Sequence, residues 1–334
     1  NASASQYSLT TDLSYKNFFA NFDLFSGLDP TEGFVSYQPL ASAVNSSLVG
    51  YLGQNVFLGV DYQNKDPAGR MSVRAESNKT FGQGLLIADL AHMPGSICGS
   101  WPAFWALGVG EDGKAMWPQA GEIDILEGVN DGMTNSVTLH TGEGCAVDNA
   151  TSPLGPNQAN TADAQMAFSG NMKTGDCNIA AANQDKNVGC SIAAPETVDG
   201  KQLPTYGDAF NKAGGGVYAM EWSSSGISVW FFASNTTASS IDLKEHPDTS
   251  TFGTPIARFS GSGCDFDTKF SNMKIIFNIA FCGQWAGDEK VWGQSCAKKT
   301  GVAKCADYVR DHPEAFAESY WEIRGLRWFE KAKG

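Results

Sequence analysis

The amino-acid sequence predicts an all-β fold, built from many short strands joined by turns. Glycine accounts for 37 of the 334 residues, and short runs rich in aromatic side chains recur along the chain. A helical pattern of apolar residues stands out only at 307–319. The length allows one large domain or two of average size, and the absence of an internal repeat or a Pro/Ser-rich linker predicts a single domain over 1–334.

Nine segments have the length and composition of strands. In chain order they are residues 72–76, 84–90, 103–108, 122–127, 135–141, 217–222, 227–232, 274–281 and 320–329. Two long polar stretches, 143–176 and 178–213, have almost no periodicity and contain Cys145, Cys177 and Cys190. Loops of this length in a compact domain are usually functional or tied by disulfides, so we expect them to border the functional site.

Charge and hydropathy argue against two classes of partner. The formal net charge is −13, without any block of Lys or Arg. Because nucleic-acid binding normally uses a clustered basic surface, no nucleic-acid partner is expected. The longest apolar runs, 84–90 and 275–281, are far shorter than the roughly 18 residues that a membrane span needs. A soluble protein is therefore expected, and we also expect it to be a monomer.

Cysteines and glycosylation acceptors indicate secretion. The eight cysteines include no Cys-x-x-Cys pair, which favours disulfides in an oxidising compartment over a zinc site. Their pairing stays open, with Cys177–Cys190 as one local guess. Since the chain begins without Met or a leader, we expect a mature extracellular protein whose signal peptide has been removed. Asn-x-Ser/Thr acceptors, where N-linked glycans are possible, occur at Asn1, Asn45, Asn78, Asn149 and Asn235.

Three carboxylates, Glu122, Asp124 and Glu127, interrupt an apolar run, GEIDILE at 121–127, that has the character of a buried strand. In a regular strand Glu122 and Asp124 share one face, whereas Glu127 falls on the other. A β-bulge at 125–126 would shift the register by one residue and bring all three carboxylates to the same face. We expect such a bulge.

This row of carboxylates suits the cleavage of a glycosidic bond. A retaining glycosidase uses one carboxylate as nucleophile and a second, roughly 5–5.5 Å away, as acid and then base. Crowded carboxylates raise at least one pKa, which keeps a proton available for a general acid. We assign Glu122 as nucleophile and Glu127 as acid/base, with Asp124 between them. A solvated acidic edge strand or a calcium site is the alternative for this motif.

Motifs on both sides of the carboxylates extend the argument to the whole chain. WPAFW at 101–105 precedes them and TLHT at 138–141 follows them, and with these flanks the segment resembles glycoside hydrolase family 16. The secreted fungal laminarinases, endo-β-1,3(4)-glucanases, are the members that the chain resembles, through further motifs: MP at 93–94, WP at 117–118, GGGVYAME at 214–221, FCGQWAG at 281–287 and YWEI at 320–323.

The resemblance implies a fold, a substrate and residue roles. The expected fold is a concanavalin-like β-jelly-roll sandwich of two antiparallel sheets, with a concave substrate cleft and long loops. The expected activity is retaining hydrolysis of β-1,3 and mixed β-1,3/1,4 glucan, without a cofactor. No metal ligands are assigned, and a structural calcium away from the cleft, which some family members hold, stays open. Glu122 matches the family nucleophile, Asp124 the assisting acid and Glu127 the acid/base. These matches agree with the assignments made from the strand pattern.

Alternation and composition suggest further substrate-binding residues. His140 shares a polar strand face with Ser136 and Thr138, and by resemblance it neighbours the acid/base, although a buried His bonded to backbone is the alternative. Arg74 is expected to bind a sugar hydroxyl, or else to form a salt bridge with Glu76. Glu221 could bind hydroxyls, with a structural role equally open.

Nine tryptophans are many for this length, and flat aromatic rings bind the apolar faces of sugars. By resemblance and context we nominate Trp105, Trp117 and Trp285 as sugar platforms, with Trp101 as a weaker nomination. Core packing is the alternative for each of them. We assign to packing the rings of Trp230, Trp321 and Trp328.

Two other functions remain open at this point. A transglycosylase would use the same carboxylates but pass the glycosyl group to another sugar, and the substrate could be another β-linked wall polysaccharide, such as β-1,6-glucan or β-1,3-galactan. A non-catalytic lectin-like module could share the fold. Such a module has no need of all three carboxylates, which argues against it.

Overall fold

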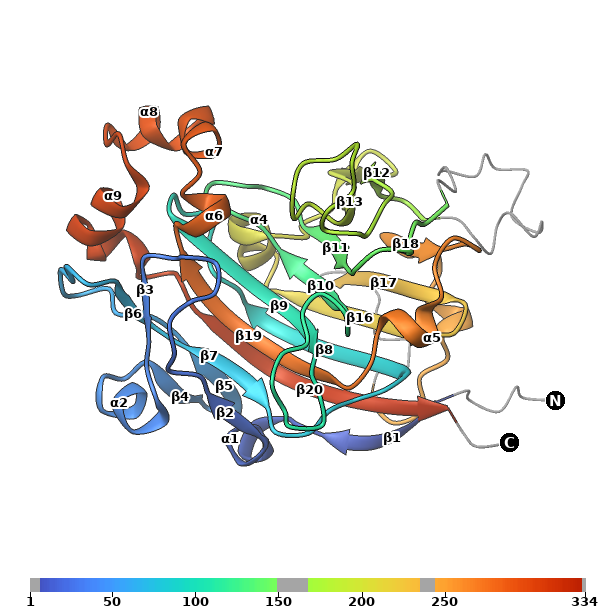
Figure 1. Ribbon diagram of the computed structural model, residues 1–334. Coiled ribbons are helices and arrows are strands. Elements are labelled where there is room, and N and C mark those ends of the chain that lie inside the picture. Colours follow the sequence, from blue (N-terminus) through green and yellow to red (C-terminus); the bar gives the residue numbers. More distant parts are fainter. Residues whose placement is uncertain (1–6, 149–167, 235–243, 332–334) are drawn as a thin grey trace.

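The computed structural model describes residues 7–148, 168–234 and 244–331. In these ranges two large antiparallel sheets stack on one another, and short helices gather beyond one end of them (Figure 1). This arrangement confirms the predicted all-β sandwich. We call the sheet that contains β9 and β10 the front sheet, and the sheet that contains β8 and β16 the back sheet. No helix in the described ranges is long and apolar enough to cross a membrane.

The front sheet has eight strands and carries the acidic segment near its middle. Its order is β12 (Asn171–Thr174), β13 (Cys190–Ala193), β11 (Ser136–His140), β10 (Glu122–Glu127), β9 (Ser100–Gly108), β19 (Met273–Phe281), β7 (Arg74–Ser77) and β2 (Phe22–Leu24). The predicted strand at 72–76 is divided in two, because β6 (Arg70–Ser72) ends before β7 and pairs in parallel with β3 (Val35–Tyr37).

The back sheet also has eight strands. Its order is β18 (Ala257–Ser260), β17 (Gly226–Ala233), β16 (Gly216–Ser223), β8 (Gly84–His92), β20 (Trp321–Lys331), β5 (Asn55–Leu58) and β4 (Val49–Leu52), and β1 (Tyr7–Asp12) pairs with β20. A further two-stranded ribbon joins β14 (Thr197–Val198) to β15 (Lys201–Gln202) within the predicted loop 178–213.

The main core lies between the two sheets, because successive residues of a strand point to opposite faces. Leu86 and Leu90 of β8 and Phe277 and Ile279 of β19 belong to this core. The alternate residues of β8, such as Leu85, point away from it into a second apolar cluster on the far side of the back sheet. The alternate residues of β9, β10 and β19 are therefore left to form the open face of the front sheet.

Helices are short and lie at the margins of the sheets. They are α1 (Phe18–Asn21), α2 (Leu40–Asn45), α4 (Gly207–Lys212), α5 (Phe266–Lys269), α6 (Gly283–Ala286), α7 (Glu289–Gln294), α8 (Cys296–Thr300) and α9 (Cys305–Asp311), with 3-10 turns η1 (Tyr15–Asn17), η3 (Thr249–Thr251) and η4 (Pro313–Phe316). The predicted helix at 307–319 is shorter than expected, since α9 ends before Pro313, which lacks the N–H that a continuing helix needs.

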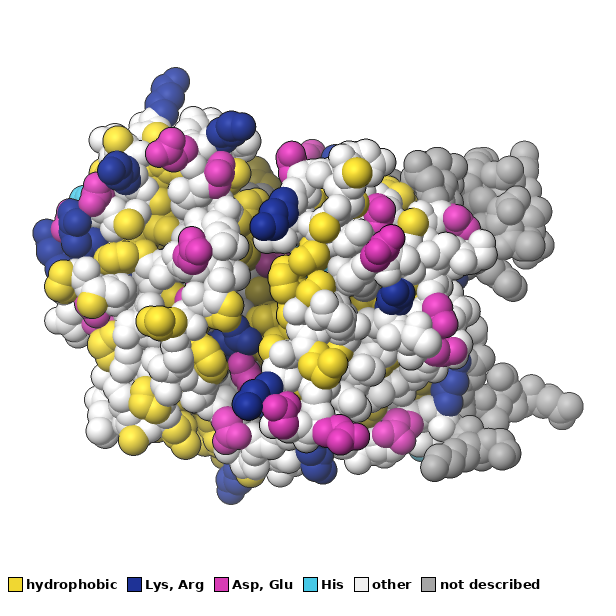
Figure 2. Space-filling model, viewed as in Figure 1, with side chains coloured by type: hydrophobic (Ala, Val, Ile, Leu, Met, Phe, Trp, Pro, Cys, Tyr) yellow, Lys and Arg dark blue, Asp and Glu magenta, His cyan; other side chains and the backbone are white. Residues whose placement is uncertain are grey.

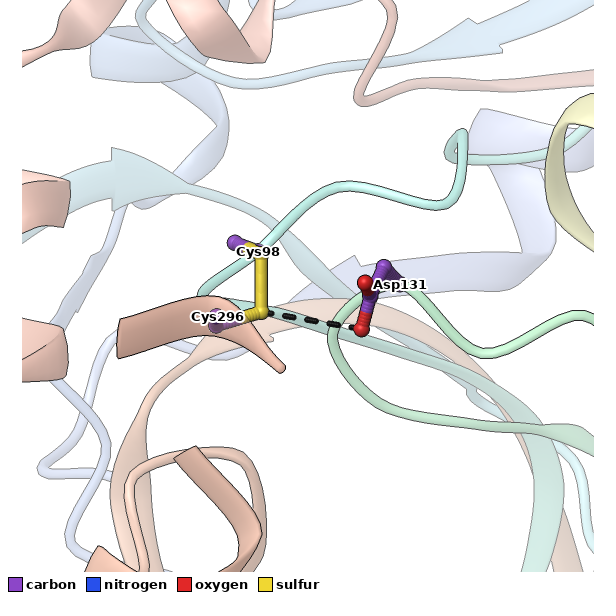
Figure 3. Close-up of side chains that lie close together, drawn as sticks. All are labelled: Cys98, Asp131 and Cys296. Atoms are coloured by element: carbon purple, nitrogen blue, oxygen red, sulfur yellow. Dashed lines mark hydrogen bonds between the residues drawn. A yellow bond between two sulfur atoms is a disulfide. The ribbon is translucent and has the colours of Figure 1, made fainter. Parts of the chain in front are cut away.

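Four disulfides hold the margins to the sheets: Cys98–Cys296, Cys145–Cys264, Cys177–Cys190 and Cys282–Cys305. The guess of Cys177–Cys190 is confirmed. Asp131 lies beside the Cys98–Cys296 disulfide, and its Oδ1 is 3.7 Å from the sulfur of Cys296 (Figure 3). Because both sulfurs are bonded to each other, they are not thiolate ligands, and this group does not form a metal site.

Candidate active site

The three carboxylates of β10 are brought to one face by an irregularity in the strand. Glu122 lies opposite Leu107 of β9, Asp124 opposite Trp105, and Glu127 opposite Ala103, with a register shift between 124 and 126. The three partners are two residues apart on β9, so they share one face, and residues directly opposed across an antiparallel pair share a face as well. The expected bulge is therefore present in β10.

β11 lines the other side of the carboxylates. Glu122 is opposite His140, and Asp124 is opposite Thr138. The Nε2 atom of His140 lies 3.2 Å from Oδ2 of Asp124, which brings His140 into the carboxylate cluster as expected. Next to them, the hydroxyl groups of Thr138 and Ser191 are hydrogen-bonded at 3.0 Å and extend the polar face onto β13.

Asp124 is the most buried of the three carboxylates, with 1% of its surface exposed. Burial raises its pKa well above the ordinary value, and the nearby charge of Glu122 and a side-chain hydrogen bond with Glu122 raise it further. The shift favours the protonated form of Asp124 beside Glu122. In that form the Asp124 carboxyl can donate a hydrogen bond to the Glu122 carboxylate.

Glu127 is also buried, with 9% of its surface exposed. Burial raises the pKa of its carboxyl well above the ordinary value, and the charge of Asp124 acts in the same direction. A hydrogen bond from the indole of Trp101 to Oε1, 2.9 Å long, and the charge of His140 both lower this pKa. The net raised pKa gives Glu127 the property that a general acid needs.

A groove crosses the open face of the front sheet, between the region of α6 to α9 and the region of β11 to β13 (Figure 2). Trp101 of β9 and Trp285 of α6 meet edge to face in this region, with ring centroids 5.7 Å apart. Trp105 lies four residues after Trp101 on the same face of β9 and directly opposite Asp124. Trp117 is in the loop before β10 and is 39% exposed. The rings assigned to packing, those of Trp230, Trp321 and Trp328, are all buried.

Arg74 and Trp105 form a stacked unit beside the carboxylates. The Arg74 guanidinium lies between the rings of Phe25 and Trp105, 4.9 Å from each centroid, and its Nε donates to Glu76 at 2.8 Å. The salt bridge that was the alternative for Arg74 is therefore present. The Trp105 indole N–H donates to Oδ1 of Asn278 at 2.9 Å, and Asn278 is a polar partner that the sequence pattern did not identify.

Glu221 is not part of this cleft, and its nomination as a substrate-binding residue was wrong. It lies on β16 of the back sheet, opposite Leu85, which belongs to the apolar cluster on the far side of that sheet. Its carboxylate accepts hydrogen bonds from Tyr7 at 2.6 Å and from Thr249 at 3.1 Å. These contacts give Glu221 a structural role, which was the alternative.

The cluster of Glu122, Asp124 and His140 has ligand atoms within 4.8 Å of one another. Two carboxylates and an imidazole this close together can pass a proton between them, and the side-chain hydrogen bond between Glu122 and Asp124 is one such contact.

The sequence profile of XgeA-like catalytic GH16 domains matches residues 22–329. The chain belongs to glycoside hydrolase family 16. An endo-1,3(4)-beta-glucanase of Arthroderma benhamiae is 38% identical over 97% of this family 16 chain and 65% of its own length. The chain spans about half to two thirds of the length of the curated fungal relatives it matches.

Two solved family 16 structures are similar in fold and sequence. Laminarinase 16A from Phanerochaete chrysosporium, solved with 6-O-glucosyl-laminaritriose in donor and acceptor sites, has a TM-score of 0.81 and 34% identity over 97% of this chain and 99% of that one. An elongating family 16 beta-1,3-glucosyltransferase has a TM-score of 0.80 and 39% identity over 97% of this chain and 100% of that one. Both agree with the predicted family and jelly-roll fold.

Proposed function

We propose that this chain is a retaining endo-β-1,3(4)-glucanase. The observation that carries the proposal is the row of Glu122, Asp124 and Glu127 on one face of β10, which the bulge creates. A retaining glycosidase needs two carboxyl groups with different protonation states on either side of the scissile bond. Glu122 and Glu127 meet this need, because Asp124 separates them and because burial raises the pKa of Glu127.

The reaction follows a double displacement. Glu127 gives its proton to the glycosidic oxygen while a carboxylate oxygen of Glu122 attacks the anomeric carbon and the leaving sugar departs. Glu127, now ionised, takes a proton from water, which attacks the same carbon and releases Glu122. Two inversions leave the configuration retained. Asp124 orients Glu122 through their hydrogen bond, and His140 contacts Asp124 from β11.

The groove supplies binding surfaces for a neutral polysaccharide. Trp105 and Trp285 offer rings to the apolar faces of sugars, and Trp117 offers a third ring at the rim. Arg74 supports the ring of Trp105 from one side. Relatives named endo-1,3(4)-beta-glucanase and the laminarinase complex with β-glucan oligosaccharides support β-1,3-linked glucan as the substrate class.

Two variants test the assignment of the carboxylates. E122S should remain folded and bind laminari-oligosaccharides while hydrolysis is lost, and full hydrolysis by this variant would reject Glu122 as nucleophile. E127A should be rescued by azide on glycosides with good leaving groups, since such leaving groups need no acid and azide replaces the activated water. The product should be the β-glycosyl azide, and failure of rescue would reject Glu127 as acid/base.

Transglycosylation is a second candidate, favoured by the 39% identity to the elongating beta-1,3-glucosyltransferase. The two activities share the first displacement and differ in whether water or a sugar hydroxyl attacks the intermediate. Incubation with a single laminari-oligosaccharide, followed by product sizing, distinguishes them. Longer chains would indicate transfer, whereas only shorter ones would indicate hydrolysis. A panel of laminarin, lichenan, pustulan and β-1,3-galactan would identify the linkage.

We further propose that the protein is secreted, N-glycosylated and monomeric. The four disulfides support an oxidising compartment. Asn45 and Asn78 are both exposed, as glycan attachment requires. The acceptors Asn1, Asn149 and Asn235 lie outside the described residues. Mass spectrometry before and after deglycosylation tests the glycans, and light scattering tests the monomer.

A further inference from the structure

Asn135 lies immediately before β11, and none of its surface is exposed. Its side chain contacts the backbone of β10 at the bulge and two residues beyond it. The Oδ1 atom accepts a hydrogen bond from the backbone N–H of Glu127 at 2.8 Å. The Nδ2 group donates to the carbonyl oxygen of Ile125, also at 2.8 Å. One buried side chain thus binds the residue inserted by the bulge and the proposed acid/base.

These two hydrogen bonds take the place of backbone pairing that is missing between β10 and β11. The pairing of β10 with β11 ends where Asp124 meets Thr138, and beyond this point β11 supplies no backbone partner to β10. Buried backbone groups that are left unpaired destabilise the folded state. A side-chain amide has a donor and an acceptor, as a peptide group has, so Asn135 takes the place of the absent ladder partner.

Asn135 is itself held in place by its own backbone. Its N–H donates to the hydroxyl of Thr205 at 3.1 Å, and its carbonyl accepts from the N–H of Ala194 at 2.8 Å. The hydroxyl of Tyr218, on β16 of the back sheet, donates to the carbonyl of Thr205 at 2.5 Å. Thr205 and Tyr218 are buried as well. The contacts of the bulge are thereby connected to the back sheet.

We propose that Asn135 is a positioning residue, which keeps the bulge closed and so directs the Glu127 carboxyl to the reacting glycosidic oxygen. The inference rests on the proposed function of Glu127 as acid/base. Asn135 is fully buried and touches no substrate, so its effect passes through the backbone of β10. Without it, Glu127 loses the bond that fixes its N–H, and its side chain moves relative to Glu122.

Kinetics of N135A against N211A test this proposal. Asn211 of α4 also accepts from a backbone N–H and donates to a backbone carbonyl, both of Met93, but it has no contact with β10. N135A should lower kcat about 100-fold, the size of effect that a displacement of about 1 Å produces, with KM within about threefold of wild type. N211A should change kcat by less than about twofold. Equal kcat for the two variants would overturn the proposal.

A second readout is independent of turnover. The indole N–H of Trp101 donates to Glu127, so its hydrogen exchange, followed by NMR, reports whether the carboxyl is in place. We expect exchange about tenfold faster in N135A than in wild type and unchanged exchange in N211A. Unchanged exchange in N135A would overturn the inference about Asn135. Absence of wild-type activity on every glucan would instead overturn the proposed function, while this readout would still decide the role of Asn135.

N135D keeps the proposal testable if N135A does not fold. A protonated carboxyl has a donor and an acceptor like the amide, whereas an ionised one only accepts and repels the Ile125 carbonyl. The kcat of N135D relative to wild type should therefore fall as pH rises through the range in which the introduced carboxyl titrates. A ratio that is constant with pH would overturn the proposal.

The backbone amide of Glu127 in the wild-type protein should also exchange its hydrogen as slowly as the amides of β10 that are bonded within the sheet. Fast exchange at Glu127 would count equally against the proposal.

Discussion

The indole N–H of Trp101 donates a hydrogen bond to Oε1 of Glu127 at 2.9 Å. This bond favours the ionised carboxylate and lowers the pKa of Glu127, against the larger effect of burial and the charge of Asp124. Trp101 was nominated as a sugar platform, but the structure gives it a contact with the proposed acid/base. The pKa of Glu127 therefore results from opposing effects, and the hydrogen bond from Trp101 is one of those that lower it.

Replacement of Trp101 by phenylalanine should move the alkaline limit of activity. W101F removes the N–H donor but keeps a ring against Trp285, so the pKa of Glu127 rises. Since Glu127 acts when protonated, the alkaline limb of kcat/KM should shift to higher pH. W230F is the matched control, because the indole of Trp230, on β17 of the back sheet, donates to the Gly253 carbonyl. No shift, or a shift to lower pH, would contradict this account.

The buried carboxyls also predict a gain of stability when the acid/base is neutralised. The pKa of Glu127 is higher in the folded protein than in the unfolded one, so between these two pKa values the folded protein binds more protons than the unfolded one. The folded protein therefore loses stability as the pH rises through this range. E127Q removes the free-energy cost of ionising a buried carboxyl. The variant should therefore unfold at a higher temperature than wild type at neutral pH, by roughly 2 °C for each kcal/mol gained in the free energy of unfolding. The difference should vanish in acid below the unfolded pKa. Calorimetry checks it, and equal Tm values at neutral pH would reject it.

The stacked unit of Arg74 and Trp105 should affect binding more than chemistry. R74A removes the guanidinium that lies on the Trp105 ring and leaves that ring without support on one side. We expect KM to rise about tenfold, corresponding to roughly 1.4 kcal/mol, with a smaller change in kcat. Titration of an oligosaccharide into E122S and E122S/R74A would isolate binding. R310A is the control, since Arg310 pairs with Asp307 and Asp311 on α9.

Gly189 should prove essential for the position of His140. Its φ is +64°, and a Cβ atom there would lie 2.3 Å from the Leu139 carbonyl oxygen and 2.8 Å from Nδ1 of His140. G189A should therefore displace His140 and lower kcat by about tenfold or more. G53A has nearly the same backbone conformation, φ +62°, but its Cβ would meet nothing within 4 Å. If G189A retained the kcat of G53A, the contact of His140 with Asp124 would not matter for turnover.

Much of the candidate site could be predicted because it follows from strand alternation. Glu122, Asp124 and His140 were assigned to a shared polar face by a period of two, and the structure has them there. Glu127 needed one added assumption, a bulge, because alternation alone directs it to the opposite face. The apolar residues at 123, 125 and 126 made that assumption reasonable, and the register shift on β9 agrees with it.

Other features could not be predicted, for identifiable reasons. Alternation shows which side of a strand Glu221 faces, but not which of the two sheets contains that strand. Asn135 was included in the predicted strand 135–141, and its role depends on a gap in the backbone pairing that only the paired strands reveal. The short helix α7 has no apolar period, and its start depends on the Asp288 side chain, which accepts from the N–H groups of Lys290 and Val291.

Because of the bulge in β10, the loops at the rim of the groove could be changed by protein engineering, whereas β10 itself must be left intact. The spacing of the three carboxylates comes from main-chain register within the front sheet, between β9 and β11, and not from the loops at the rim of the groove. We therefore expect that exchanging loops such as the one that carries Trp117 would leave the spacing of the three carboxylates unchanged. Insertion or deletion of a single residue inside β10 would instead rotate one carboxylate out of reach and destroy turnover altogether.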